Sequence, residues 1–224
     1  LQGFNMTTHN LGYPRIGDFR ELKFTLEAYW KGEKTLQELE NLGREIRYQN
    51  FQTQIQAGIN LIPVNDFAYY DQMLNMSTLL GVIPKRFRQD DFDIEVAFRM
   101  ARGRAPSDDG FACCSHTHDG ESTIVSKADY AGAMKKWFDT NYHYIVPELE
   151  EDTRFEITDT RLFDEVAEAL TLKQDNSNID FKPVLIGPVT YLYLAENKGN
   201  LIPKLQHLPG LVKIYNQILD KLAN

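Results

Sequence analysis

The stretch Gly58-Ile59-Asn60-Leu61-Ile62-Pro63-Val64-Asn65-Asp66 marks the passage from one helix through a strand to the next helix. Gly58 ends the preceding helical pattern, because glycine readily adopts the left-handed conformation that terminates helices. The apolar run Ile59–Val64 predicts a short strand, and Asp66 is a suitable cap for a helix that continues to about Leu80. This succession of elements is typical of an α/β fold.

The same alternation extends outward from this stretch in both directions. Upstream, apolar residues at helical spacing predict helices that begin after Asp18 and Thr35, each with a glutamate three residues later as in a capping box. The segment Asn10–Gly17 is expected to be extended, because a residue before proline avoids the helical region. Downstream, the pattern predicts strands at Tyr142–Val146 and Val184–Val189, and helices at Ile94–Ala101, near Tyr130, at Arg161–Leu172 and at Lys204–Leu222.

Strands that alternate with helices predict parallel strands joined by helical crossovers. A closed barrel of this kind takes eight strands and about 250 residues, and the chain stops on a helix where another strand would follow. We therefore expect an α/β fold that forms part of a (β/α) TIM-type barrel. This portion occupies residues 10–224, after a tag remnant and leader at residues 1–9, and it includes a flexible loop at residues 103–129 that is rich in Gly, Ser, Asp and His.

Composition excludes several classes of protein. The chain has 224 residues, of which 42% are hydrophobic and 25% charged, as in ordinary globular proteins. No apolar run approaches the roughly 18 residues of a membrane span, so we expect a cytoplasmic protein without a membrane partner. A net charge of −8 repels polyanions, which argues against a nucleic-acid partner. An anionic ligand would have to be held by a local cluster of cations.

The side chains of Cys113, Cys114, His116, His118 and Asp119 are metal ligands by type. Adjacent cysteines followed by His-x-His fit none of the usual zinc spacings, so we expect a loop here and no metal site in this chain. Neighbouring cysteines also cannot staple distant segments, which argues against a disulfide scaffold.

A series of short segments has a fixed order along the chain. They are Leu11–Gly17, Arg20–Lys23, Gln56–Ile59, Ile62–Val64, Asp66-Phe67, Asp71, Ala101–Arg104, Met134–Phe138, Asn141–Tyr144 and Gly187–Thr190. Each segment alone is a weak signal, but their ordered combination resembles the amino-terminal region of the cobalamin-independent methionine synthase family. Gly187-Pro188 is read as a turn at a strand end and not as a phosphate loop, because the lysine and glycine spacing of such a loop are absent.

The resemblance implies a two-barrel methyltransferase that moves a methyl group from 5-methyltetrahydropteroyltri-L-glutamate to homocysteine. In such enzymes the amino-terminal barrel contributes to the folate site. The carboxy-terminal barrel carries a zinc ion, held by a His, two Cys and a Glu, that activates the homocysteine thiol. We therefore expect no catalytic residue in this chain, and we expect zinc and homocysteine to bind a carboxy-terminal domain that it lacks.

The resemblance also implies the residues that contact the folate polyglutamate. They are Phe19, Arg20, Glu21, Leu22 and Lys23, together with Lys136 in a second segment. Arg20 and Lys23 are expected in the first turn of a helix, where free N–H groups favour an anion. Phe19 departs from the family pattern, because some relatives carry a basic residue there.

Other residues near these segments have two interpretations. Lys135 is an alternative to Lys136, and Arg15 is either a ligand clamp or a salt-bridge partner. The aromatic residues Trp137, Phe138 and Tyr142 are expected in the core. His143 is expected to be a hydrogen-bonded structural histidine rather than a base.

Two functions are compatible with these features. The first is the folate-binding part of the methyltransferase, inactive alone; the second is a stand-alone, non-catalytic folate-binding or structural module. For the part-barrel, unpaired strand edges and an open apolar face predict a homodimer; the alternative is that the helix Lys204–Leu222 folds across the open side.

Overall fold

The computed structural model describes residues 7–88, 92–103, 130–174, 176–199 and 202–223. The chain divides into two compact units. The first unit contains Leu1–Glu27, Thr35–Tyr69 and Thr160–Leu185, and the second contains Ala28–Lys34, Tyr70–Asp159 and Ile186–Asn224.

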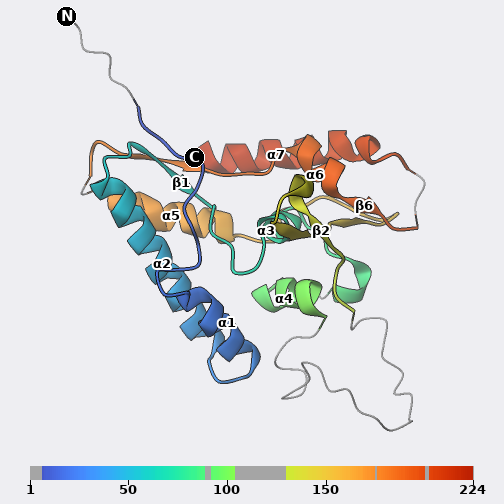
Figure 1. Ribbon diagram of the computed structural model, residues 1–224. Coiled ribbons are helices and arrows are strands. Elements are labelled where there is room, and N and C mark those ends of the chain that lie inside the picture. Colours follow the sequence, from blue (N-terminus) through green and yellow to red (C-terminus); the bar gives the residue numbers. More distant parts are fainter. Residues whose placement is uncertain (1–6, 89–91, 104–129, 175, 200–201, 224) are drawn as a thin grey trace, which may run out of the picture. The chain divides into compact units, whose positions relative to one another are not determined.

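The first unit is built around a pair of parallel strands. Its elements are the start of α1 (Glu21–Trp30), α2 (Leu36–Gln56), β1 (Leu61–Val64), α5 (Arg161–Lys173) and β5 (Asp180–Pro183). β1 pairs with β5 in parallel, with Leu61 opposite Asp180, and both α2 and α5 pack against β1 (Figure 1). The core between them contains Phe51, Ile62 and Ala169. β1 lies in the predicted strand Ile59–Val64 and its pairing is parallel, whereas no strand was predicted at Asp180–Pro183.

The second unit contains the remaining elements. They are α3 (Gln72–Leu79), η1 (Lys85–Phe87), α4 (Ile94–Arg102), β2 (Met134–Lys136), η4 (Trp137–Asp139), β3 (His143–Ile145), β4 (Glu148–Leu149), α6 (Pro188–Leu194), β6 (Glu196–Asn197), η5 (Lys204–His207) and α7 (Leu208–Ala223). Strands β2 and β3 form an antiparallel hairpin, and β4 pairs with β6 in parallel. Leu74, Phe87, Val96 and Ile145 belong to one buried cluster that joins α3, η1, α4 and β3.

The expectation of a partial TIM-type barrel is confirmed only as far as the α/β class. The described residues form a mixed α/β structure with three two-stranded sheets, and these do not close into a barrel. The β2–β3 hairpin is antiparallel, which corrects the expectation of parallel strands throughout. A short turn joins these two strands, and a turn of that length reverses the chain direction.

The predicted strand Val184–Val189 is wrong. β5 ends at Pro183, and α6 begins at Pro188. Proline is well suited to the first position of a helix, because its φ is already helical and its missing N–H has no helical partner there. Val184–Ile186 are half-buried, so their apolar character reflects partial burial and not a central strand.

The helix cap predicted at Asp66 is also wrong. Asp71 caps α3 by accepting the Leu74 N–H at 2.9 Å. The Asp66 carboxylate instead accepts the backbone N–H of Tyr13 at 2.7 Å, which ties the opening segment to the end of β1. Asp66 is followed by Phe67, and Asp71 is followed after one residue by Met73. The apolar pattern alone therefore did not show which aspartate caps the helix.

The helix predicted near Tyr130 is absent, because Met134–Lys136 form β2 there. The helices predicted at Thr35–Gly58, Ile94–Ala101, Arg161–Leu172 and Lys204–Leu222 are confirmed by α2, α4, α5 and α7. In the described part of the chain, no helix is long and apolar enough to cross a membrane. The predicted loop 103–129, with Cys113 to Asp119, lies outside the described residues except for Gly103.

Candidate functional site

The predicted folate segment 19–23 lies at the start of α1, in the first unit. Arg20 has a φ of +67°, an uncommon conformation for a residue with a side chain, so the helix begins at Glu21. The expected capping box at Asp18 and the placement of Arg20 in the first turn are therefore corrected. The Glu21 carboxylate accepts the backbone N–H of Phe19 at 2.9 Å, and Leu22 is fully buried. Glu21 and Leu22 thus hold the local fold.

The cations of this segment face solvent. Lys23 Nζ lies 3.7 Å from the carboxylate of Glu27 one turn later, with both side chains nearly half exposed, and pairs of this kind are weak. Arg20 is exposed and makes no ion pair with the described residues. Phe19 is 81% exposed. Arg20 and Lys23 are therefore accessible to a carboxylate that approaches from solvent.

Arg15 has a structural role in the first unit. Its Nη1 donates hydrogen bonds to the carbonyl oxygens of Ala68 at 2.5 Å and Tyr69 at 3.1 Å. These bonds join the opening segment to the chain that follows β1. These acceptors are backbone carbonyls, so the two hydrogen bonds do not decide between a ligand clamp and a salt-bridge partner.

Lys135 and Lys136 lie on β2, in the second unit, and have different surroundings. Lys135 Nζ forms an ion pair with Glu196, and this hydrogen bond raises the pKa of Lys135. Hydrogen bonds from Lys135 and Lys198 lower the pKa of the Glu196 carboxyl. Lys136 is exposed and has no ion pair among the described residues. Lys136 is therefore the lysine of this strand that is free to bind an anion.

The aromatic residues after β2 are not in the core. Phe138 is 53% exposed and Tyr142 is 40% exposed, so the expectation of core packing is wrong for them. They lie at and after the turn of the hairpin, where Phe138 stacks on Tyr193 and the Tyr142 hydroxyl donates to Asp71. His143 is also exposed, and its imidazole makes no hydrogen bond with the described residues, against the expectation of a hydrogen-bonded side chain.

A buried carboxylate holds this hairpin on α3. The Asp71 carboxylate accepts hydrogen bonds from the Tyr142 hydroxyl at 2.7 Å and the Ile145 N–H at 3.0 Å, besides capping α3 through Leu74. Burial raises the pKa of the Asp71 carboxyl, and these hydrogen bonds oppose the shift. Sequence reasoning missed this role, although an aspartate directly before a helical pattern is a recognisable cap signal.

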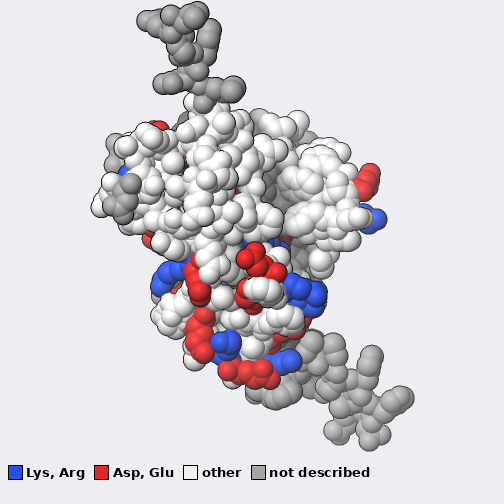
Figure 2. Space-filling model, turned by 60° about the vertical axis from the view of Figure 1, so that its left-hand side comes forward, with Lys and Arg blue, Asp and Glu red and all other residues white. Residues whose placement is uncertain are grey.

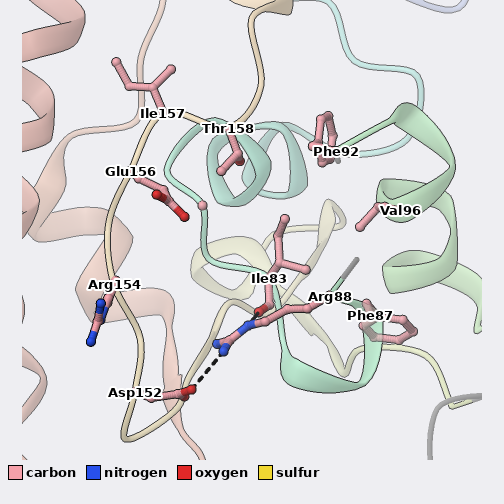
Figure 3. A pocket seen from close by; sticks show the side chains of 11 residues that line it. Ile83, Phe87, Arg88, Phe92, Val96, Asp152, Arg154, Glu156, Ile157 and Thr158 are labelled. Carbon is pink, nitrogen blue, oxygen red and sulfur yellow. Dashed lines mark hydrogen bonds and ion pairs between the residues drawn. The ribbon is translucent and has the colours of Figure 1, made fainter. Parts of the chain in front are cut away.

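One pocket lies within the second unit and has a volume of about 650 Å³ (Figure 3). Apolar side chains such as Ile83 and Phe92 line one part of it, and charged side chains line another. Arg88 forms an ion pair with Asp152 at 2.9 Å, which Figure 3 shows as a dashed line, and a second with Glu150 at 3.2 Å. The Arg88 charge is therefore already compensated, and none of the predicted folate residues lines this pocket.

A second ionic cluster joins α2 to α5 in the first unit. Arg47 lies 2.7 Å from a Glu168 oxygen and 3.5 Å from a Glu165 oxygen, and all three side chains line a pocket of about 470 Å³. Burial raises the pKa of Glu165 to about 7, and Arg47 opposes the shift. One Glu165 oxygen is buried without a hydrogen-bond partner, so the negative charge of the ionised carboxylate is only partly stabilised.

The surface charge is mixed. On the face shown in Figure 2, Lys and Arg side chains lie among Asp and Glu side chains and do not form a continuous basic surface. Within the described residues, no three His, Cys, Asp or Glu side chains are grouped closely enough to hold a metal ion. The accessible cations Arg20 and Lys23 lie in the first unit, and Lys136 lies in the second.

These features define an α/β protein with exposed cations and no grouped metal ligands among its described residues. The chain belongs to the family of the cobalamin-independent synthase, N-terminal domain, whose model matches residues 7–224.

Its relatives agree with this assignment. The chain is 46% identical over 219 residues to a 5-methyltetrahydropteroyltriglutamate–homocysteine methyltransferase of Shewanella oneidensis, 45% identical over 215 residues to that of Aeromonas salmonicida, and 44% identical over 217 residues to that of Yersinia pestis. These matches cover 96–97% of this chain. The chain spans 26% of the length of each of these relatives.

Proposed function

We propose that this chain is the amino-terminal, folate-binding part of a methyltransferase that moves a methyl group from 5-methyltetrahydropteroyltri-L-glutamate to homocysteine. The observation that carries the proposal is the match along nearly the whole chain to relatives whose names state this reaction. In this proposal the described structure is part of a (β/α) barrel that further strands complete, and the protein is cytoplasmic.

The role of this chain is to hold the glutamate tail of the folate. Arg20, Lys23 and Lys136 are exposed cations, and the tail of a triglutamate carries several carboxylates at neutral pH. Charge-assisted hydrogen bonds from these side chains position the substrate, and they do not take part in bond making. Lys135 contributes less, because Glu196 already occupies its ammonium group.

The chemical step belongs to a carboxy-terminal part. Homocysteine sulfur is a strong nucleophile as a thiolate, and a zinc ion supplies that activation by lowering the thiol pKa. In this proposal the zinc ligands belong to that carboxy-terminal part.

The test is to express the complete open reading frame that contains this sequence and to measure methionine formation from homocysteine and the triglutamate folate. We expect turnover by the complete protein and none by the 224-residue chain. Turnover by the chain alone would contradict the proposal. A natural stop codon after Asn224 would favour the alternative, a stand-alone folate-binding or structural module.

A further inference from the structure

The turn of the β2–β3 hairpin presents an aromatic ring next to a second ring from α6. The rings of Phe138 and Tyr193 are stacked, with centroids 6.1 Å apart and planes only 5° from parallel. Phe138 is 53% exposed and Tyr193 is 67% exposed. Val189, one turn before Tyr193 on α6, is also exposed and extends the same helix face. We call Phe138, Tyr193 and Val189 the aromatic platform.

The backbone at this turn is strained in a way that presents the ring. Phe138 and Asp139 have φ values of +44° and +60°, and neither is a glycine. Such conformations are costly for residues with side chains, and they concentrate at sites that bind ligands. Hydrogen bonds hold the turn: the Thr140 N–H donates to the Trp137 carbonyl at 2.9 Å, and the Trp137 N–H donates to the Tyr142 carbonyl at 2.7 Å.

The second ring is also fixed in place. Lys204 Nζ donates to the carbonyl oxygen of Tyr193 at 2.6 Å and to that of Ala195 at 2.8 Å. The hairpin contacts the same region through the Tyr144 hydroxyl, which donates to the Leu194 carbonyl at 3.1 Å. The platform is therefore exposed but preorganised, so that little conformational entropy is lost when a ring stacks on it.

A free cation lies next to the platform in the sequence. Lys136 is two residues before Phe138 and has no ion pair among the described residues. A second cation, Lys204 Nζ, lies 5.8 Å from the Tyr193 ring centroid, but its ammonium already donates to two backbone carbonyls. Flat apolar surface and a lysine without an ion pair match a ligand that combines a flat ring with a carboxylate. In a folate polyglutamate, the p-aminobenzoyl ring is joined by an amide bond directly to the first glutamate.

We infer that the aromatic platform stacks the p-aminobenzoyl ring of the folate while Lys136 holds a carboxylate of its glutamate tail. This inference rests on the proposed function and adds a ring-binding subsite on Phe138 and Tyr193. An offset aromatic contact of this kind contributes about a three- to tenfold gain in affinity.

The test uses the complete protein and two probes, p-aminobenzoyl-triglutamate and tri-γ-glutamate, with dissociation constants measured by calorimetry. We expect p-aminobenzoyl-triglutamate to bind about three- to tenfold more tightly. Phe138→Leu and Tyr193→Leu should remove that advantage and leave tri-γ-glutamate binding unchanged. Phe138→Tyr should preserve it, as should Tyr48→Leu, a control at an exposed tyrosine of the first unit.

A spectroscopic measurement checks the same contact. Trp137 and Phe138 have ring centroids 5.3 Å apart, and the chain has two tryptophans. In the complete protein, we expect p-aminobenzoyl-triglutamate to change tryptophan fluorescence and tri-γ-glutamate to leave it unchanged, and Trp137→Phe should remove the change.

The two proposals fail in different ways. In one outcome, tri-γ-glutamate binds and Lys136→Ala weakens that binding, but the p-aminobenzoyl ring adds no affinity or the platform variants change the affinity for both probes equally. This outcome would overturn the ring subsite and leave the proposed function standing. If tri-γ-glutamate does not bind at all, the proposed function is overturned together with the inference.

Discussion

Lys135 and Lys136 are adjacent in sequence and differ in their electrostatic surroundings. Lys135 is paired with Glu196, whereas Lys136 is exposed without an ion pair among the described residues. Successive residues of a strand point to opposite faces, so neighbours on β2 meet different parts of the molecule. This difference provides a matched pair of substitutions.

We expect Lys136→Ala and Arg20→Ala to weaken binding of the triglutamate folate to the complete protein by up to about fivefold each, because exposed ion pairs contribute up to about 1 kcal/mol. The monoglutamate folate, with fewer carboxylates, should lose less affinity, and homocysteine binding should not change. Lys135→Ala is the control and should have a smaller effect. Equal losses for both folates would contradict the assignment.

Asp71 is the residue on which the hairpin depends. Its carboxylate accepts hydrogen bonds from Tyr142, Ile145 and Leu74, and it is 1% exposed. Asp71→Asn replaces one acceptor oxygen by a donor group. If the amide oxygen keeps the Ile145 and Leu74 N–H groups, the Tyr142 hydroxyl loses its acceptor.

We expect Asp71→Asn to reduce the free energy of unfolding by about 1–3 kcal/mol, and Tyr142→Phe to reduce it by about 0.5–1.5 kcal/mol. Urea unfolding at constant pH measures both. An unchanged midpoint for Asp71→Asn would show that the carboxylate does not hold the hairpin on α3.

At the scale of elements, α2 and α5 are joined by charges and not only by apolar packing. Arg47 of α2 faces Glu165 and Glu168 of α5. Burial raises the pKa of Glu165 to about 7 from an ordinary value of 4.5, because the ionised form is poorly solvated there. The groups that modulate this shift are Arg47, Arg161, Glu168 and Asp66.

The pH dependence follows from this shift. Below about pH 4.5, Glu165 is protonated in both the folded and unfolded states. Between about pH 4.5 and 7, the folded state retains a proton that the unfolded state has lost, so stability falls as pH rises through this window by about 3 kcal/mol. Above pH 7 this contribution is constant.

We expect Glu165→Gln to remove that slope, so that the free energy of unfolding changes less between pH 5 and pH 7 than in the unmodified chain. Urea unfolding at a series of pH values measures the slope. Glu45→Gln, at an exposed position of α2, is the control and should keep it. The same slope in both variants would exclude Glu165 as its source.

At the scale of the whole molecule, the described strands leave edges without partners. β5 pairs with β1 on one side, and within the described residues no strand pairs with its other side. Strand edges with free N–H and C=O groups favour pairing with another chain.

We therefore expect the isolated chain to form a dimer with twice the 25.8 kDa mass of one chain. Light scattering at micromolar concentration and at a tenfold higher concentration measures this mass. A monomer mass that does not change on concentration would contradict the dimer.

The sequence by itself determined the family, the α/β class and the principal helices. The capping box at Thr35 and Glu38, for example, correctly marked the start of α2. Caps, prolines and apolar periodicity act over a few residues, so they can be read without knowledge of the fold. The resemblance likewise depended on short segments in a fixed order.

Only the tertiary structure decided which side chains are free and which are engaged. Glu196 neutralises Lys135 from a distant part of the chain, Asp71 caps α3 and also binds β3, and Tyr193 meets Phe138 across two elements. These contacts join residues that are far apart in sequence, and their partners are set by packing. Local patterns therefore identified the candidate residues, whereas long-range packing determined that Lys135 is paired and that Lys136 is exposed.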